Sequence, residues 1–309
     1  MRILVTGASG FVGRSVVSAL RDAGHEVRTA GLSSNAVDFQ VSLGAKADWS
    51  AAVASCDSVV HAGGRAHVLE RSAAQAAATF EDINTAGTLT LANAAANAGV
   101  RHFVFISSIA AMGDGSTSPL RETDIPGPTT PYGQSKLAAE LGLVTLSERT
   151  RLAVTCLRPP LVYGPDAGGR FGQMLRWCNF GLPLPFGSIE NQKSYLAVEN
   201  LADAVRVSLA AGVSATGVFN VADEGSLSTP EMLRLIGMGL DRPARLFAVP
   251  AIVLRSMRRL GLAEPIDKLS QTLVLDTNKF QSKFNWVPPV ALREGIVDAA
   301  RRYRQLAQA

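Results

Sequence analysis

Short hydrophobic runs alternate with longer helical patterns through the first half of the chain. The short runs are rich in β-branched and aromatic residues, whereas the stretches between them are rich in Ala and Leu and are long enough for helices. Strands are predicted over 2–6, 26–30, 58–61, 103–107 and 154–157, and helices near 12–23, 79–98 and 131–149. Strands that alternate with helices of this length predict right-handed βαβ units, and therefore a parallel sheet.

The second half of the chain has a different residue composition and a less regular alternation of predicted elements. Gly and Pro become frequent, and helical patterns return near 199–211 and 228–240. We expect residues 1–164 to form a doubly wound parallel sheet domain, with returning segments near 196–222, and residues 165–309 to form mostly a smaller α/β substrate lobe. Because no low-complexity linker separates the two parts, we expect them to pack closely.

The composition is that of a globular chain with a substantial core. Hydrophobic residues make up 47% and charged residues 18% of the 309 positions. The longest nearly apolar stretch, 103–112, is shorter than the ~18 residues that a membrane helix needs. Cys56, Cys156 and Cys178 are widely spaced, which favours reduced thiols and a cytoplasmic location. The net charge of +4 comes from scattered Lys and Arg, so solvated helix faces are favoured over contact with nucleic acid or a membrane.

The first predicted strand runs directly into a glycine-rich turn, after which helical periodicity begins. The turn reads Gly7-Ala8-Ser9-Gly10-Phe11-Val12-Gly13. Glycines allow a tight turn and close approach of the backbone to a ligand, and the N-terminus of the following helix attracts a pyrophosphate. In a βαβ context this arrangement predicts a dinucleotide site. The contacts expected from the turn are Gly7, Ser9, Gly10, Phe11, Val12 and Gly13.

The end of the second predicted strand leaves the choice between NAD and NADP open. An NAD-specific site usually offers an Asp or Glu there to the adenosine ribose, and residues 28–34 contain neither. Ser33 and Ser34 are instead suited to hydrogen-bond a 2′-phosphate. We therefore expect NAD or NADP as the cofactor, with a slight preference for NADP.

Tyr132 and Lys136 are four residues apart and hence on one face of the helix predicted over 131–149. An ammonium beside a phenol stabilises the phenolate and lowers the tyrosine pKa from about 10 toward the working pH. Tyr132 can then exchange a proton with a hydroxyl or carbonyl oxygen while a nicotinamide exchanges hydride with the attached carbon. Ser107 and Ser108 end a predicted strand, so their hydroxyls belong at the carboxyl edge of the sheet, where ligands bind in this architecture.

On these residues the chain resembles the extended short-chain dehydrogenase/reductases, and among them the NAD-dependent epimerase/dehydratase family with its nucleotide-sugar 4-epimerases and 4-keto reductases. The resemblance covers nearly the full length. Matching segments are 7–13, 84–88, 107–113, 131–136, 157–165, 200–203, 276–279 and 284–288. It implies a Rossmann-type fold, with Ser108 and Tyr132 at the reacting oxygen and Lys136 also at the nicotinamide ribose. It further implies that Ala62 and Gly63 pass close to the cofactor.

The same resemblance implies a nucleotide-sugar substrate held largely by the second lobe. Polar contacts are expected from Tyr163, Arg170 and Lys193, in or near the cleft. Related epimerases usually carry an arginine near the position of Lys193, and lysine neutralises phosphate without the bidentate fork of arginine. Residues 109–111 hold no carboxylate after Ser108, which disfavours a sugar 4,6-dehydratase.

Several functions stay open on the sequence. A UDP-hexose 4-epimerase leads, and an NADPH-dependent 4-reductase of a UDP-4-keto-6-deoxy-hexose, with or without an N-acetylamino group, needs the same three residues. Reduction of a flavonoid- or steroid-like ketone fits the late sequence matches less well. A non-catalytic dinucleotide-sensing regulator has no need of the Ser-Tyr-Lys set. The expected partner is a UDP-sugar, and homodimer formation is left open.

The remaining polar candidates are interpreted as structural or set aside. We expect His61 to be a strand-end packing residue, and Asn84 to hold its helix against the fourth strand. The histidines have no second ligand at metal spacing, so no metal site is predicted.

Overall fold

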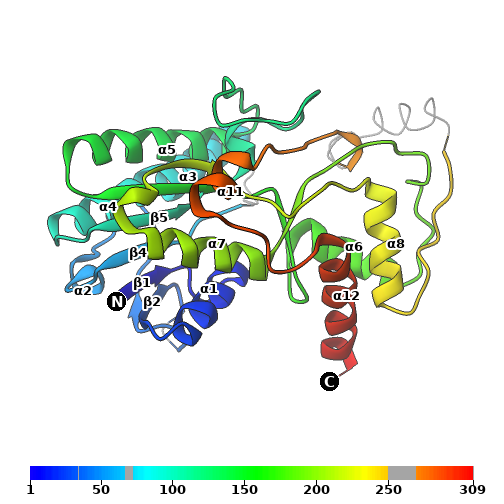
Figure 1. Ribbon diagram of the computed structural model, residues 1–309, viewed down its shortest axis with the longest axis horizontal. Coiled ribbons are helices and arrows are strands. Elements are labelled where there is room, and N and C mark those ends of the chain that lie inside the picture. Colours follow the sequence, from blue (N-terminus) through cyan, green and yellow to red (C-terminus); the bar gives the residue numbers. More distant parts are fainter. Residues whose placement is uncertain (34, 67–71, 250–268, 309) are drawn as a thin grey trace.

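The computed structural model describes residues 1–33, 35–66, 72–249 and 269–308, so Ser34 lies outside the described residues. A sheet unit with helices on both faces lies beside a smaller, mostly helical lobe (Figure 1). Among the described residues, no helix is both long and apolar enough to span a bilayer.

Seven strands form the central sheet, and all neighbouring pairs are parallel. The order is β3-β2-β1-β4-β5-β6-β9. The bounds are Arg2–Thr6 (β1), Glu26–Gly31 (β2), Phe39–Gln40 (β3), Ser58–His61 (β4), His102–Ile106 (β5), Ala153–Arg158 (β6) and Gly217–Asn220 (β9). The strand order reverses between β1 and β4, so a crevice opens there at the carboxyl ends of the strands. The α/β doubly wound fold predicted from the sequence is confirmed.

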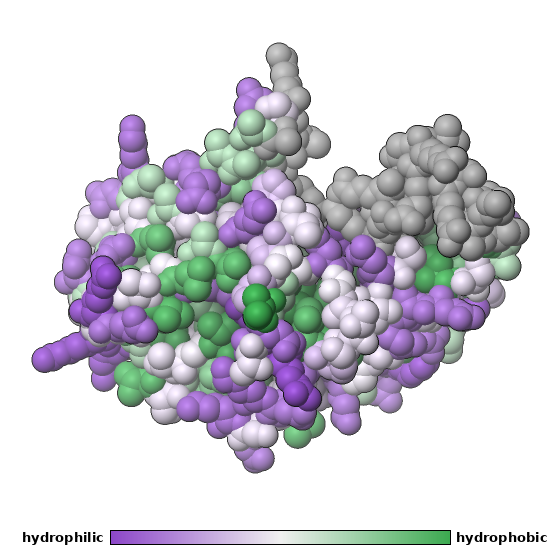
Figure 2. Space-filling model, turned by 90° about the horizontal axis from the view of Figure 1, so that it is seen from above, coloured by the Kyte–Doolittle hydropathy of each residue, from purple (hydrophilic) through white to green (hydrophobic). Residues whose placement is uncertain are grey.

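Helices cover both faces of this sheet (Figure 1). Side chains of β1 alternate between two cores: Ile3 and Val5 pack with α1 and α7, whereas Leu4 packs on the opposite side with α2, α4 and α5. The bounds are Phe11–Asp22 (α1), Ser50–Val53 (α2), Ala73–Phe80 (α3), Gly87–Asn97 (α4), Pro131–Arg149 (α5) and Val198–Ala211 (α7). Seen from above, hydrophobic residues form separate groups among hydrophilic ones (Figure 2).

The single helix expected over 79–98 is interrupted by a π-helical turn at Glu81–Ala86, between α3 and α4. This wider turn brings buried side chains onto α5: Asn84 Nδ2 donates to Ser135 Oγ (3.1 Å), and Thr85 Oγ1 donates to the Ser135 carbonyl (3.1 Å). A π turn often marks a functional region, and here it lies beside the helix that carries Tyr132.

The smaller lobe has its own core, formed mainly by α6, α8 and α12 (Figure 1). A short parallel pair, β7 and β8, lies between the sheet unit and the lobe. The bounds are Leu161–Tyr163 (β7), Gly169–Asn179 (α6), Tyr195–Ala197 (β8), Thr229–Gly239 (α8) and Leu292–Gln308 (α12). A capping box between Ser228 and Glu231 starts α8.

Two late segments return to the sheet unit. Within 196–222, α7 packs against α1, and β9 pairs with β6. The second return is α11 (Asn278–Phe284). Its Phe280 packs edge-on against Phe219 of β9, with ring centroids 5.8 Å apart, and Trp286 packs on Phe280 at 5.1 Å.

Candidate active site

The glycine turn and the loop after β4 approach each other closely at the carboxyl edge of the sheet. Gly7 has a φ of +67°, and a Cβ there would lie 2.6 Å from the Gly63 nitrogen. A Cβ on Gly13 would lie 2.1 Å from the Gly7 carbonyl oxygen, so only glycine fits. Gly10 is the N-cap of α1, and no side chain caps the first backbone N–H groups of the helix. These residues fit the pyrophosphate of a dinucleotide.

The adenosine end of this site has no acid at the end of β2. A Cβ on Gly31 would lie 3.4 Å from Ser9 Oγ, so this position faces the glycine turn. The next acidic residue along the chain, Asp38, is turned back onto β2: its Oδ2 accepts from the Thr29 nitrogen (2.8 Å) and from Thr29 Oγ1 (2.9 Å). Ser33 is exposed.

A cavity of about 470 Å³ lies at the same edge, between the sheet unit and the lobe. It brings together residues that are far apart in the sequence. Its lining includes Val12, Ala62 and Gly63 from the dinucleotide side, Ser108, Tyr132 and Lys136 in the middle, and Arg170 and Lys193 from the lobe. Gly7, Ser9, Gly10, Phe11, Gly13 and Ser33 are not part of this lining.

The start of α5 fits against the turn that carries Ser108. The Thr130 side chain caps the helix by accepting from the Gly133 nitrogen (3.2 Å), and Pro131 takes the first helical position. A Cβ on Gly133 would lie 2.3 Å from the Ala110 carbonyl oxygen, so glycine allows the close contact. The Ser108 side chain lies close enough to Tyr132 to lower the pKa of its phenol. Both residues line the cavity.

Burial controls the charge of the two predicted catalytic groups. It lowers the pKa of Lys136 to about 8, and it raises the pKa of Tyr132, against the opposing effect of Ser108. The lowered tyrosine pKa expected from the sequence is wrong for the protein alone. The reason is burial of the phenol, which outweighs the opposing effect of Ser108. Lys136 Nζ donates to the Ile106 carbonyl (2.9 Å) and lies 4.5 Å from the centroid of the Phe105 ring.

Two cationic side chains line the lobe side of the cavity. Lys193 lies before β8, and its backbone exchanges two hydrogen bonds with Leu227 (3.0 Å each). Burial lowers the pKa of Lys193 to about 8, and the nearby Arg170 acts in the same direction. Two cations that repel each other in a partly buried cavity are suited to a dianionic group such as a diphosphate.

Tyr163 is not a cavity residue, which corrects the sequence prediction. It is 1% exposed, and its hydroxyl donates to Asp223 Oδ2 (2.8 Å) and to the Leu292 carbonyl (3.3 Å). Its ring packs on Phe171 of the lobe core, with centroids 5.6 Å apart. The side chain therefore stabilises the contact between β7 and the lobe and does not face the cavity.

His61 and Asn84 are structural, as expected, although Asn84 has different partners. His61 is fully buried, with Nδ1 at 2.6 Å from Thr6 Oγ1 and Nε2 at 3.0 Å from Thr88 Oγ1. Asn84 holds the loop after β4 rather than the strand itself. Its Oδ1 accepts from the Arg65 nitrogen (2.8 Å), and its Nδ2 donates to the Arg65 carbonyl (2.9 Å).

Sequence reasoning missed two charged residues of the cavity lining, Arg65 and Asp114. Arg65 follows β4, and Asp114 follows Gly113 in the turn after β5. The only available signal was their position just beyond predicted strands, at the edge where ligands bind in doubly wound folds.

Comparison with known proteins agrees with this geometry. Residues 3–222 match the model of the NAD dependent epimerase/dehydratase family. A UDP-glucose 4-epimerase of Vibrio cholerae is 34% identical over 98% of this chain and 95% of its own length. One of Mycolicibacterium smegmatis is 28% identical over 100% of both chains.

Solved structures show the same fold. The structure of MoeE5 in complex with UDP-glucose and NAD has a TM-score of 0.81 at 22% identity and covers 99% of this chain and 100% of the other. The Thermus thermophilus UDP-glucose 4-epimerase in complex with NAD has a TM-score of 0.78 at 25% identity and covers 98% of this chain and 99% of the other.

Proposed function

This chain belongs to the NAD-dependent epimerase/dehydratase family, and on that basis we propose that it is a UDP-hexose 4-epimerase. One observation carries the proposal: a single cavity is lined by Ser108, Tyr132 and Lys136 in its middle and by Arg170 and Lys193 from the lobe. A molecule with a reactive secondary alcohol and a diphosphate has a partner for each group in that cavity. Two full-length relatives are named UDP-glucose 4-epimerases, which favours UDP as the nucleotide.

The proposed chemistry assigns one task to each polar residue. Tyr132 removes the proton from O4 of the sugar and later returns it, and Ser108 hydrogen-bonds the same oxygen. Lys136 supplies the positive charge that stabilises the phenolate of Tyr132. Bound NAD supplies the acceptor, and then the donor, of the hydride at C4. Arg170 and Lys193 anchor the diphosphate while the 4-keto sugar turns over, so that its other face meets the hydride.

A second candidate is the NADPH-dependent UDP-4-keto-sugar reductase. It is favoured by the end of β2, where Gly31 faces Ser9 without an acid and Asp38 is bonded to Thr29. The dinucleotide that co-purifies with the protein separates the two functions. Retained NAD⁺ supports the epimerase, whereas freely exchanging NADPH supports the reductase.

The substrate class is tested by calorimetry with UDP, TDP and free hexose. UDP should bind the wild type, and Lys193→Ala should weaken it about tenfold or more, because a hydrogen bond to a charged group contributes about 1.5–3 kcal/mol. Lys283→Ala, which removes an exposed lysine of α11, is the matched control and should leave UDP affinity unchanged. If neither UDP nor TDP binds the wild type, the nucleotide-sugar interpretation is wrong and a small-ketone reductase takes its place.

A further inference from the structure

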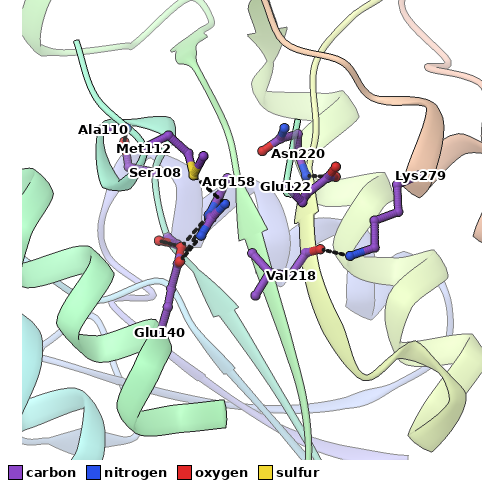
Figure 3. Close-up of polar contacts among 10 residues, drawn as sticks. Ser108, Ala110, Met112, Glu122, Glu140, Arg158, Val218, Asn220 and Lys279 are labelled. Atoms are coloured by element: carbon purple, nitrogen blue, oxygen red, sulfur yellow. Dashed lines mark hydrogen bonds and ion pairs between the residues drawn. The ribbon is translucent and has the colours of Figure 1, made fainter. Parts of the chain in front are cut away.

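A buried series of alternating charges connects α5 to the end of β6. Lys136, Glu140 and Arg158 are each at most 5% exposed. Glu140 follows Lys136 by one helical turn and therefore lies on the same face of α5. Glu140 and Arg158 point toward each other (Figure 3): Arg158 Nε donates to Glu140 Oε1 (3.0 Å), and a terminal nitrogen donates to Oε2 (2.5 Å). Its other terminal nitrogen lies 2.8 Å from Met112 Sδ.

The same carboxylate also holds the strand end that carries Ser108. Ser107 Oγ donates to Glu140 Oε1 (2.5 Å). The Ser107 nitrogen donates to the Leu157 carbonyl (2.8 Å), so this turn is fixed to β6 as well. Glu140 therefore lies where α5 and the ends of β5 and β6 meet, next to the turn that positions a hydroxyl in the cavity.

Glu140 is the anion that opposes the effect of burial on Lys136. The titratable groups that interact electrostatically with the lysine are Glu140 from α5, His61 from β4 and Cys156 from β6. Burial lowers the pKa of His61 to about 3 and raises the pKa of Cys156 well above its usual range, so both are neutral. Burial lowers the pKa of Lys136, and the charge of Glu140 raises it.

Arg158 is the counter-ion of the buried Glu140 carboxylate. A buried carboxylate without a partner would take up a proton rather than stay ionised. The forked contact with the guanidinium gives both carboxylate oxygens a charged donor. The arginine thus satisfies both carboxylate oxygens of Glu140, and Glu140 acts in turn on the lysine.

We propose that Glu140 is a positioning residue, which places a carboxylate one helical turn from Lys136 and holds the Ser107–Ser108 turn, with Arg158 as its counter-ion. The proposal rests on the proposed function, because the acid–base role of Tyr132 and Lys136 belongs to that function. Activity should then be lost as the pH rises through the Lys136 pKa, since the neutral amine no longer stabilises the phenolate.

The test compares Glu140→Gln with Glu148→Gln, which neutralises an exposed carboxylate of the same helix. The Lys136 pKa is followed by the ¹³Cε shift in lysine-labelled, cofactor-free protein, and the signal is assigned by its loss in Lys136→Arg. Glu140→Gln should lower the Lys136 pKa by about one pH unit. The alkaline limb of the kcat–pH profile should move to lower pH by the same amount, so that kcat at pH values above the limb falls about tenfold. KM should change little. Glu148→Gln should leave both readings unchanged, and Glu140→Asp, which keeps the charge, should restore the pKa.

A variant that leaves Arg158 unpaired risks failing to fold. In that case Glu140→Gln combined with Arg158→Gln removes both charges and should lower the Lys136 pKa in the same direction. An unchanged Lys136 pKa in the folded variant overturns the proposal and leaves the epimerase function standing, since the titration needs neither substrate nor cofactor. A lowered pKa in a protein without epimerase activity supports the role of Glu140 and contradicts the proposed function.

Discussion

Tyr132 transfers the proton in the proposed reaction, so its hydroxyl is the atom that mutation tests most directly. Tyr132→Phe keeps the ring and its edge contact with Phe80 (5.9 Å). We expect kcat to fall by ~10²–10⁴-fold with cofactor affinity nearly unchanged, because only the acid–base group is lost. Steady-state kinetics and a cofactor titration measure the two effects, with Tyr303→Phe in α12 as the control. Retention of more than about a tenth of the activity would show that another group moves the proton.

The lowered pKa of Lys193 predicts that UDP affinity depends on pH. Its pKa is lowered to about 8 by burial and by Arg170, so near pH 8 a large fraction is neutral when no ligand is bound. A diphosphate beside it favours the charged form, so UDP binding should take up a proton, and UDP affinity should fall as the pH rises through about 8. Calorimetry in two buffers with different ionisation enthalpies measures the uptake. Lys193→Met should abolish it, and equal uptake in both proteins would contradict this role.

Among the secondary-structure elements, the buried strands of the central sheet could be predicted from the sequence, whereas the three-residue strands could not. The strands β1 and β4 are buried on both faces and read as continuous hydrophobic runs, so their predicted bounds match the structure. In contrast, β7 and β8 have three residues each, too few for a period of two to stand out. This is why the side to which Tyr163 points was predicted wrongly. The partners of Asn84 depend on a π-helical turn, which no hydrophobic pattern indicates.

The end of β2 gives a test of cofactor choice. Gly31→Asp should shift preference from NADPH toward NADH, because the position faces Ser9 and a carboxylate there repels a 2′-phosphate and accepts from the ribose. Ala30 is unsuitable because its side chain is buried among core residues. The exposed Leu32→Asp adds the same charge one residue later and is the control. Fluorescence titration with both cofactors measures the shift, and equal selectivity in the two variants would place the ribose elsewhere.

Across the full chain, a buried polar cluster joins the sheet unit to the lobe. Asp223, which follows β9, accepts from Tyr163 of β7 (2.8 Å) and from Asn200 Nδ2 of α7 (2.7 Å). The Asn200 side chain also donates to the Val290 carbonyl (2.8 Å), just before α12. The relative placement of the two cavity walls therefore depends on residues that do not line the cavity.

Tyr163→Phe tests this structural role. It leaves a buried acceptor without its donor and should lower the free energy of unfolding by about 1–3 kcal/mol, while UDP affinity stays unchanged. Tyr195→Phe is the matched control for stability alone, because the buried Tyr195 hydroxyl finds no hydrogen-bond partner among the described residues but the residue lines the cavity. Chemical denaturation and UDP calorimetry measure the two effects. A Tyr163→Phe protein of normal stability with weakened UDP binding would return Tyr163 to the substrate site.

The fate of UDP-galactose in the presence of the purified enzyme and NAD⁺ decides whether the protein is an epimerase. Proton NMR should show conversion to UDP-glucose until the two sugars reach a fixed ratio, and the absorbance of NADH should show no net accumulation. The opposite result is equally specific. If no UDP-hexose is inverted at C4, and NADPH is consumed when a UDP-4-keto sugar is supplied, the protein is a reductase and the epimerase account is wrong.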